Sequence, residues 1–220
     1  MVTTRGNSHG KYVKISAHLD ECPDCLNRTF LFNIEGTLQD LCDAISYLIG
    51  ATFEHPYEIQ GPYFHYWTEE MLTGNDDDFL HLLNLQEYRL DQIELYSNRT
   101  LYYCYDFGDD YRFKLHIGTR LFEKEGDLIA IPVKGYGVSI FEDNKYGLLD
   151  YYQYRKLPKE EYPWNYKMTR NSNGFFRELT VKEMTKSLAD LGSIDPLFVD
   201  EEDIDLSFYS SKKTKEDSVK

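Results

Sequence analysis

The chain has 220 residues, of which 41% are hydrophobic and 15% aromatic, and it is long enough to bury one sizeable core. Its 24 basic and 38 acidic residues give a net charge of −14, which repels phosphate backbones and anionic membrane surfaces. Direct nucleic-acid binding is therefore not expected unless a local basic patch exists. Since the sequence has no membrane-length apolar run and its start, MVTTRGNSHGK, lacks the apolar segment of a secretory signal, we expect a cytoplasmic protein.

Two strands are predicted near the start, at residues 11–19 (KYVKISAHL) and 28–34 (RTFLFNI), because both segments alternate in period two. Between them, Cys22 and Cys25 have the spacing of metal ligands or of a redox pair. A zinc ribbon needs a second such pair, and a thioredoxin-type pair lies between a strand and a helix. We therefore expect no bound metal and interpret the segment as a turn, with metal or redox chemistry at the two cysteines as the alternative.

An amphipathic helix is predicted over residues 38–49, with Thr37 as its N-cap and Gly50 as its C-terminal stop. One face of this helix is apolar and carries Leu38, Leu41, Cys42, Ile45, Leu48 and Ile49. Extended structure resumes over residues 55–67 (HPYEIQGPYFHYW). The opening order is therefore β-β-α-β, which is compatible with a β-grasp-like sheet covered by one helix.

The remaining pattern predicts antiparallel strands and a C-terminal helix, and so an α+β fold. Residues 75–84 fit a short helix or loop, and the segment after them fits either helix or strand. Three further strands are predicted at 100–107, 109–117 and 127–135. Residues 136–178 are tyrosine-rich and irregular, whereas 180–192 form a helix with a capping-box pattern.

We divide the chain into three parts: a flexible N-terminus at 1–10, a single α+β domain at 11–194 and an acidic tail at 195–220. The tail has too few apolar residues to offset the entropy of ordering, so we expect it to be disordered.

The segment LYYCYDFGDDYRF, residues 101–113, contains the Asp-Phe-Gly triplet of protein kinases. Kinase chemistry is excluded because the chain lacks the His-Arg-Asp loop, the Gly-rich phosphate loop and the Val-Ala-Ile-Lys strand. We interpret the core as a type II′ hairpin with Gly108 and Asp109 at its centre. In that register Asp106 pairs with Tyr111 and lies on the apolar face of the hairpin.

A carboxylate on an apolar face is costly unless it has a partner, so Asp106 should contact a tyrosine hydroxyl, a histidine or backbone N–H groups of the turn. Two roles are open. Asp106 is either a structural anchor, in which case its change to Asn costs stability, or a site residue, in which case melting is unchanged while activity or binding is lost.

Other candidate residues fit a metal-dependent enzyme. His55 lies beside two glutamates in FEHPYEIQ, and with Asp106, Asp109 and Asp110 it is a candidate to surround a divalent ion. The 19 tyrosines also fit a protein-recognition surface.

The segment YCYDFGDDYRFKLHI resembles the signature of the plasmid ORF-3-like family, first described from a root-inducing plasmid and also labelled as TnpR-type passengers of insertion elements. The opening strand, the NRTFLFNIEGTLQDLCDAISYLIGA segment and HPYEI are similar in pattern, so the resemblance covers residues 11–155. It implies an α+β fold with a β-grasp-like portion and an association with plasmids, phages or transposons. The binding candidates that follow are Tyr105, Phe107, Glu142 and Tyr151. The chain departs from the family in lacking a Cys-Gly-Gly element after residue 136.

We therefore expect a non-catalytic accessory protein of mobile-element origin that binds another protein and needs no cofactor. One alternative is a metal-dependent hydrolase or nuclease that uses Asp106, Asp109, Asp110 and His55. The other is an acidic inhibitor that mimics nucleic acid through the clusters at 75–78, 106–110 and 200–205.

Overall fold

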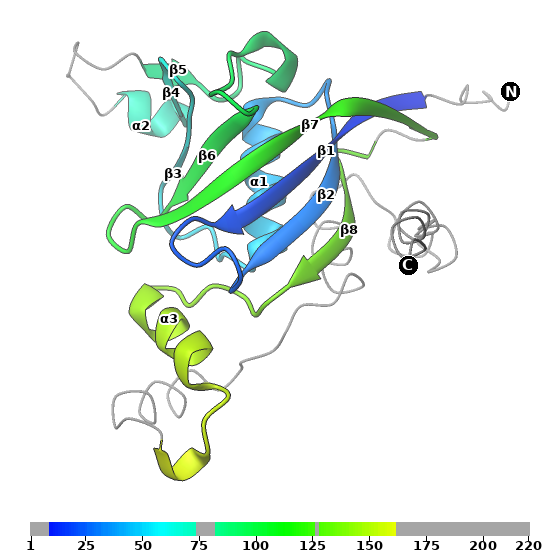
Figure 1. The fold of residues 1–220 in the computed structure, drawn as a ribbon. Coiled ribbons are helices and arrows are strands. Elements are labelled where there is room, and N and C mark those ends of the chain that lie inside the picture. The colour runs from blue at the N-terminus through cyan, green and yellow to red at the C-terminus, as the bar shows by residue number, and fades with distance from the viewer. Residues whose placement is uncertain (1–8, 74–81, 126–127, 162–220) are drawn as a thin grey trace, which may run out of the picture.

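The structure is a computed structural model that describes residues 9–73, 82–125 and 128–161. Its strands form one mixed sheet in the order β5-β4-β3-β6-β7-β1-β2-β8 (Figure 1). Neighbouring strands are antiparallel except β4 and β5, which are parallel. The elements are β1 (His9–Leu19), β2 (Asn27–Asn33), α1 (Leu38–Ile49), β3 (Tyr57–Gln60), β4 (His65–Trp67), α2 (Glu69–Thr73), β5 (Leu82–Asn84), η1 (Leu90–Gln92), β6 (Thr100–Tyr105), β7 (Tyr111–Glu125), β8 (Ala130–Tyr136), α3 (Lys145–Tyr154) and η2 (Lys159–Glu161).

The α+β class and the opening β-β-α-β order are confirmed. Helix α1 has the predicted limits, and Thr37 and Asp40 form a reciprocal capping box at its start. Gly50 ends it with φ 77°, a left-handed conformation in which a residue with a Cβ is strained.

The core lies between α1 and one face of the sheet. In Figure 1, α1 lies behind the central strands. Its apolar face packs on fully buried side chains of β1, β2 and β7, among them Ile15, Phe30, Phe32 and Phe113. Burying each of these side chains stabilises the fold by about 1.5–3 kcal/mol.

Arg28 is a buried charge that holds the end of α1 to the chain that follows β8. Its guanidinium donates hydrogen bonds to the carbonyls of Leu48, Asn27, Tyr136, Gly137 and Val138. Burial lowers the pKa of Arg28 to about 10, so the side chain stays charged near pH 7. Arg28 therefore fixes the positions at which two segments begin, residues 50–56 after α1 and residues 137–144 after β8.

The pairing register of the β6–β7 hairpin differs from the predicted register by one residue. Tyr105 pairs with Tyr111, and a five-residue loop, 106–110, joins them where a two-residue turn was predicted. The alternation is therefore reversed along β6, whose core face carries Leu101, Tyr103 and Tyr105 in place of Tyr102 and Cys104. Strand β7 keeps the predicted core face, with Tyr111, Phe113 and Leu115. Asp106 is buried as predicted, but as the first residue of the loop rather than as part of a strand.

Residues 136–161 are more regular than the sequence indicated, since they contain helix α3, with Asn144 as its N-cap. The short helix α2 was not predicted either. The predicted helix at 180–192 and the tail at 195–220 lie outside the described residues. Within the described part of the chain, no helix is long and apolar enough to cross a membrane.

Candidate functional site

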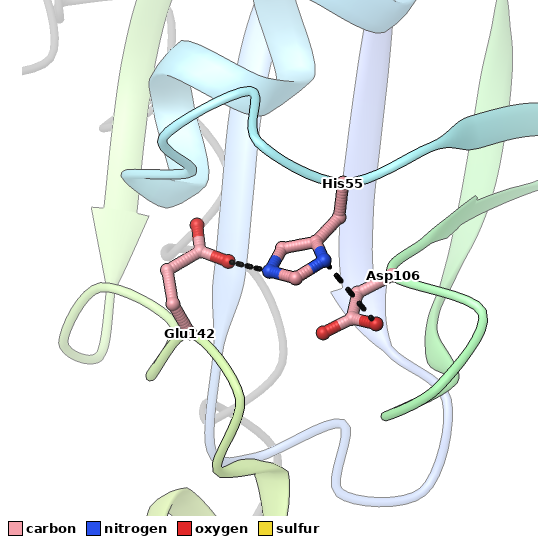
Figure 2. Close-up of side chains that lie close together, drawn as sticks. All are labelled: His55, Asp106 and Glu142. Carbon is pink, nitrogen blue, oxygen red and sulfur yellow. Dashed lines mark ion pairs between the residues drawn. The ribbon is translucent and has the colours of Figure 1, made fainter.

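Three loops bring His55, Asp106 and Glu142 together (Figure 2). His55 lies between α1 and β3, Asp106 directly follows β6, and Glu142 lies between β8 and α3. One possible ligand atom from each of the three side chains lies within 4.8 Å of the other two. This group, His55, Asp106 and Glu142, is called the three-residue cluster below.

Asp106 is fixed by its own loop and by the chain next to His55. Its Oδ1 accepts hydrogen bonds from the backbone N–H groups of Gly108 and Asp109, at 3.0 and 3.2 Å. Its own N–H donates to the carbonyl of Pro56. The backbone has φ 55°, a left-handed conformation that Asp tolerates better than most residues.

The second oxygen of Asp106 has no hydrogen-bond partner although it is buried. Among the described residues, Asp106 Oδ2 and Arg112 Nε are the only buried side-chain polar atoms without a hydrogen-bond partner. The Asp106 side chain is 7% exposed. In Figure 2 this oxygen is the one without a dashed line, and it lies on the side of the carboxylate nearer Glu142. A buried carboxylate oxygen without a partner is costly, which makes it a candidate ligand atom.

His55 lies between the two carboxylates. Its Nδ1 is 3.8 Å from Asp106 Oδ1, and its Nε2 is 3.6 Å from Glu142 Oε2. The exposed Asp143 approaches Nε2 to 3.4 Å from the solvent side. The ring also meets Tyr105 edge to face, with 5.9 Å between ring centres.

Glu142 is held by donors on both sides. Its Oε1 accepts a hydrogen bond from the backbone N–H of Thr52 at 2.7 Å. The Tyr105 hydroxyl lies 3.0 and 3.1 Å from its two carboxylate oxygens. Burial raises the pKa of Tyr105 to about 12, so the phenol keeps its proton near neutral pH and donates it to the carboxylate.

Contacts outside the three-residue cluster hold the loop that carries Glu142. The Tyr111 hydroxyl donates to the Phe141 carbonyl and accepts from the Phe141 N–H. Asp109 Oδ2 accepts a hydrogen bond from the N–H of Lys145, and the Lys145 ammonium joins the carbonyl of Asp110 to the carboxylate of Glu21. The Asp-Phe-Gly-Asp-Asp loop therefore supports the start of α3 as well as supplying Asp106.

Several predicted site residues lie elsewhere. Asp110 is exposed. Phe107 is 43% exposed, and the centre of its ring lies 6.4 Å from the centre of the Trp67 ring. Tyr151 lies on α3 and packs against Phe141, outside the cluster. Cys22 and Cys25 form a disulfide, so neither offers a thiolate to a metal in this structure.

Three residues that support the site were not among the sequence candidates: Thr52, Tyr111 and Lys145. Each acts on a loop distant in the chain, and no local pattern in the sequence marks such a contact.

The donor set of the cluster is one imidazole and two carboxylates, together with the nearby carboxylate of Asp143. Such nitrogen and oxygen donors bind Zn²⁺ and Mn²⁺, and carboxylates alone suit Mg²⁺. Carboxylates that lie close together repel one another, and a divalent ion would offset that repulsion. The donor set is therefore of a kind that divalent cations bind.

Comparison with known proteins gives a family and a fold. Residues 11–179 match the family model described as plasmid pRiA4b ORF-3-like protein. The chain belongs to this family. No curated protein matches the chain.

A crystal structure of a protein of unknown function from Methanosarcina mazei Go1 has a similar fold, with a TM-score of 0.65 and 20% sequence identity. The match covers 80% of this chain and 97% of that chain.

Proposed function

We propose that this ORF-3-like protein is a metal-dependent hydrolase whose divalent ion is bound by His55, Asp106 and Glu142. One observation carries the proposal: three potential ligands from three separate loops converge within 4.8 Å, and one of them, Asp106, presents a buried oxygen without a partner. Side chains that meet only for structural reasons would pair their buried polar atoms with one another.

The distances within the cluster support an ion between these groups. A direct N–H···O hydrogen bond has a length of about 2.7–3.2 Å, whereas the His55 ring nitrogens lie 3.6 and 3.8 Å from Glu142 and Asp106. Two ligands that are each about 2.1 Å from one ion lie about 3.4 Å apart at the tetrahedral angle. One ion can use only one ring nitrogen of His55, so the 3.6 Å between Nε2 and Glu142 is the separation that fits two ligands of one ion, with a ligand atom of Asp106 within 4.8 Å of both residues.

Hydrolysis is the reaction class that this donor set suits best. A divalent ion lowers the pKa of a bound water toward neutrality and polarises a carbonyl or phosphoryl oxygen. The exposed carboxylate of Asp143, at the mouth of the cluster, is then placed to accept a proton from the attacking water. The net charge of −14 argues against a polynucleotide substrate, so we favour a small substrate over a nuclease reaction.

The test is calorimetric titration of the purified full chain with Mn²⁺, Zn²⁺ and Mg²⁺, followed by hydrolysis assays with ester, amide and phosphoester substrates. We expect one site per chain, lost in Asp106→Asn and Glu142→Gln. The control is Asp110→Asn, because Asp110 lies in the same loop but is exposed and outside the cluster. Equal metal binding by Asp106→Asn and Asp110→Asn would contradict the proposed site, and metal binding without hydrolysis of any substrate class would contradict the hydrolase.

The other functions considered from the sequence stay predictions. These are the protein-interaction role of mobile-element origin and the mimicry of nucleic acid by acidic clusters. Neither is supported by a convergence of described residues comparable to the three-residue cluster. We also propose that β1, β2, α1 and β3 form a β-grasp-like unit, because the β1–β2 hairpin packs on α1 and β3 belongs to the same sheet, with β6 and β7 inserted between β1 and β3.

A further inference from the structure

The sheet has a second face, turned away from α1, on which basic side chains gather. In Figure 1, β1, β6 and β7 lie in front of α1, and none of the labelled helices lies in front of them. Along β7 the alternate residues Arg112, Lys114 and His116 lie on this face. On β1, His18 pairs with Lys114, and its ring stacks on His116 with 5.1 Å between centres. A basic strip therefore crosses the middle of a protein whose net charge is −14.

At one end of this strip there is a pocket of about 190 Å³. It is lined by Tyr96, Ser97, Asn98, Thr100, Tyr102, Lys114 and His116. The described lining thus combines an ammonium and an imidazole with hydroxyl and amide groups, and it contains no Asp or Glu. Such a lining offers several hydrogen-bond donors and positive charge to an anion.

Tyr102 forms an aromatic wall of the pocket and is itself fixed by cations. The guanidinium of Arg112 lies 4.0 Å from the centre of its ring, and the Lys114 ammonium lies 5.9 Å from it. Tyr96 meets the same ring edge to face at 5.8 Å. Arg112 Nε is the second buried polar atom without a hydrogen-bond partner among the described residues. Tyr102 is therefore held between the Arg112 guanidinium over its face and the ring of Tyr96.

We propose that this pocket binds a small phosphorylated molecule, with Lys114 and His116 facing the phosphate and Tyr96 and Tyr102 facing the group attached to it. A phosphate carries close to two negative charges and several acceptor oxygens, which matches a lining with one ammonium, one imidazole and neutral donors.

A small ligand is favoured over a nucleic-acid strand for two reasons. A volume of about 190 Å³ accommodates a phosphate and part of its substituent. A strand that extended beyond the basic strip would meet the field of a protein with a net charge of −14.

This inference is independent of the proposed hydrolase. The pocket lies at the first residues of β6, which begins at Thr100, whereas Asp106 follows the last residue of that strand. Tyr102, the lining residue of β6 nearest to Asp106 in the chain, is four residues from it, which separates the two places by about 13 Å along the strand. Failure of one proposal therefore leaves the other unaffected.

The experiment is a titration of the full chain with inorganic phosphate, with adenosine 5′-monophosphate and with a short single-stranded oligonucleotide, followed by calorimetry. We expect the nucleotide to bind, inorganic phosphate to compete with it, and Lys114→Met to weaken nucleotide binding by about tenfold or more, because one charge-assisted hydrogen bond is lost. Lys114→Arg should keep most of the affinity, since the positive charge remains. Lys11→Met, which removes an exposed lysine of β1 outside the pocket, serves as the matched control.

Three results would overturn the inference. The first is no binding of phosphate or nucleotide at about 10 mM. The second is equal nucleotide affinity for Lys114→Met and Lys11→Met. The third is an oligonucleotide that binds more tightly than the mononucleotide, which would assign the basic strip to a nucleic acid. Thermal melting of each variant shows whether it has folded, and Lys114→Arg tests the charge if Lys114→Met does not fold.

Discussion

Replacing Asp106 by Asn and by Ala separates a metal ligand from a structural anchor. Asn keeps the oxygen that accepts from the N–H groups of Gly108 and Asp109, and it tolerates the backbone φ of 55°. The apo form of Asp106→Asn should therefore differ from the wild type by less than about 1 kcal/mol in free energy of unfolding. Ala loses both hydrogen bonds and is strained in the left-handed region, so Asp106→Ala should cost about 3 kcal/mol.

The response to metal is the second half of this prediction. An ion at about 100 times its dissociation constant stabilises the folded protein by about 2.7 kcal/mol. For a chain of 220 residues this raises the melting temperature by roughly 5–10 °C. The wild type should show this rise in Mn²⁺ or Zn²⁺, and Asp106→Asn should not, because its amide nitrogen takes the place of the free carboxylate oxygen.

The assay is thermal and urea unfolding of the three proteins with and without the ion. Asp106 is not a metal ligand if Asp106→Asn gains as much stability from the ion as the wild type does. It is a structural anchor if Asp106→Asn is as unstable as Asp106→Ala without metal.

Three further predictions concern the groups that hold the site in place. Arg28→Met should destabilise the protein by about 3–5 kcal/mol in urea unfolding, because several buried carbonyls lose their donor; a loss below about 1 kcal/mol would contradict this. Lys145→Met should cost about 2 kcal/mol and the exposed Lys156→Met almost nothing, since only Lys145 joins Glu21 to the Asp110 carbonyl. Stability should also fall as the pH rises from about 10 towards 12, because the folded protein keeps the proton of Tyr105, whose pKa is raised to about 12, while the unfolded chain loses it. Tyr105→Phe should show a shallower fall over this pH range, and an unchanged slope would argue against the burial of that phenol.

The sequence predicted the elements with strong local signals. Helix α1 was predicted with its limits because its apolar spacing and the caps at Thr37 and Gly50 are local features. The strands β1, β2, β6 and β7 were also predicted, since alternating apolar residues mark them.

The register of the β6–β7 hairpin was predicted wrongly because distant contacts determine it. Tyr105 and Tyr111 are both buried and form the last pair of the hairpin, and their hydroxyls reach Glu142 and Phe141. These partners lie 37 and 30 residues further along the chain, so the Gly-Asp pair in the loop gave no indication of them. Helix α3 was missed because its tyrosine-rich segment has little apolar periodicity.

The residues of the candidate site could be predicted from the sequence, but their meeting at one point of the fold could not. His55, Asp106 and Glu142 were each singled out from the sequence, although in different candidate roles, whereas the disulfide between Cys22 and Cys25 was not expected. The three residues meet because two sets of contacts hold their loops. Arg28 fixes the start of residues 50–56 and 137–144. Tyr105 and Tyr111, which flank the loop 106–110, bind Glu142 and Phe141 through their hydroxyls. Such convergence depends on tertiary contacts that no single segment encodes.

An anomalous-difference map from crystals of the full chain grown with Mn²⁺ or Zn²⁺ would locate an ion bound by His55, Asp106 and Glu142. We expect one strong peak within about 2.0–2.3 Å of a His55 ring nitrogen, Asp106 Oδ2 and a Glu142 carboxylate oxygen. A map without this peak, or with the peak elsewhere while the three side chains keep their present arrangement, would show that the cluster binds no ion.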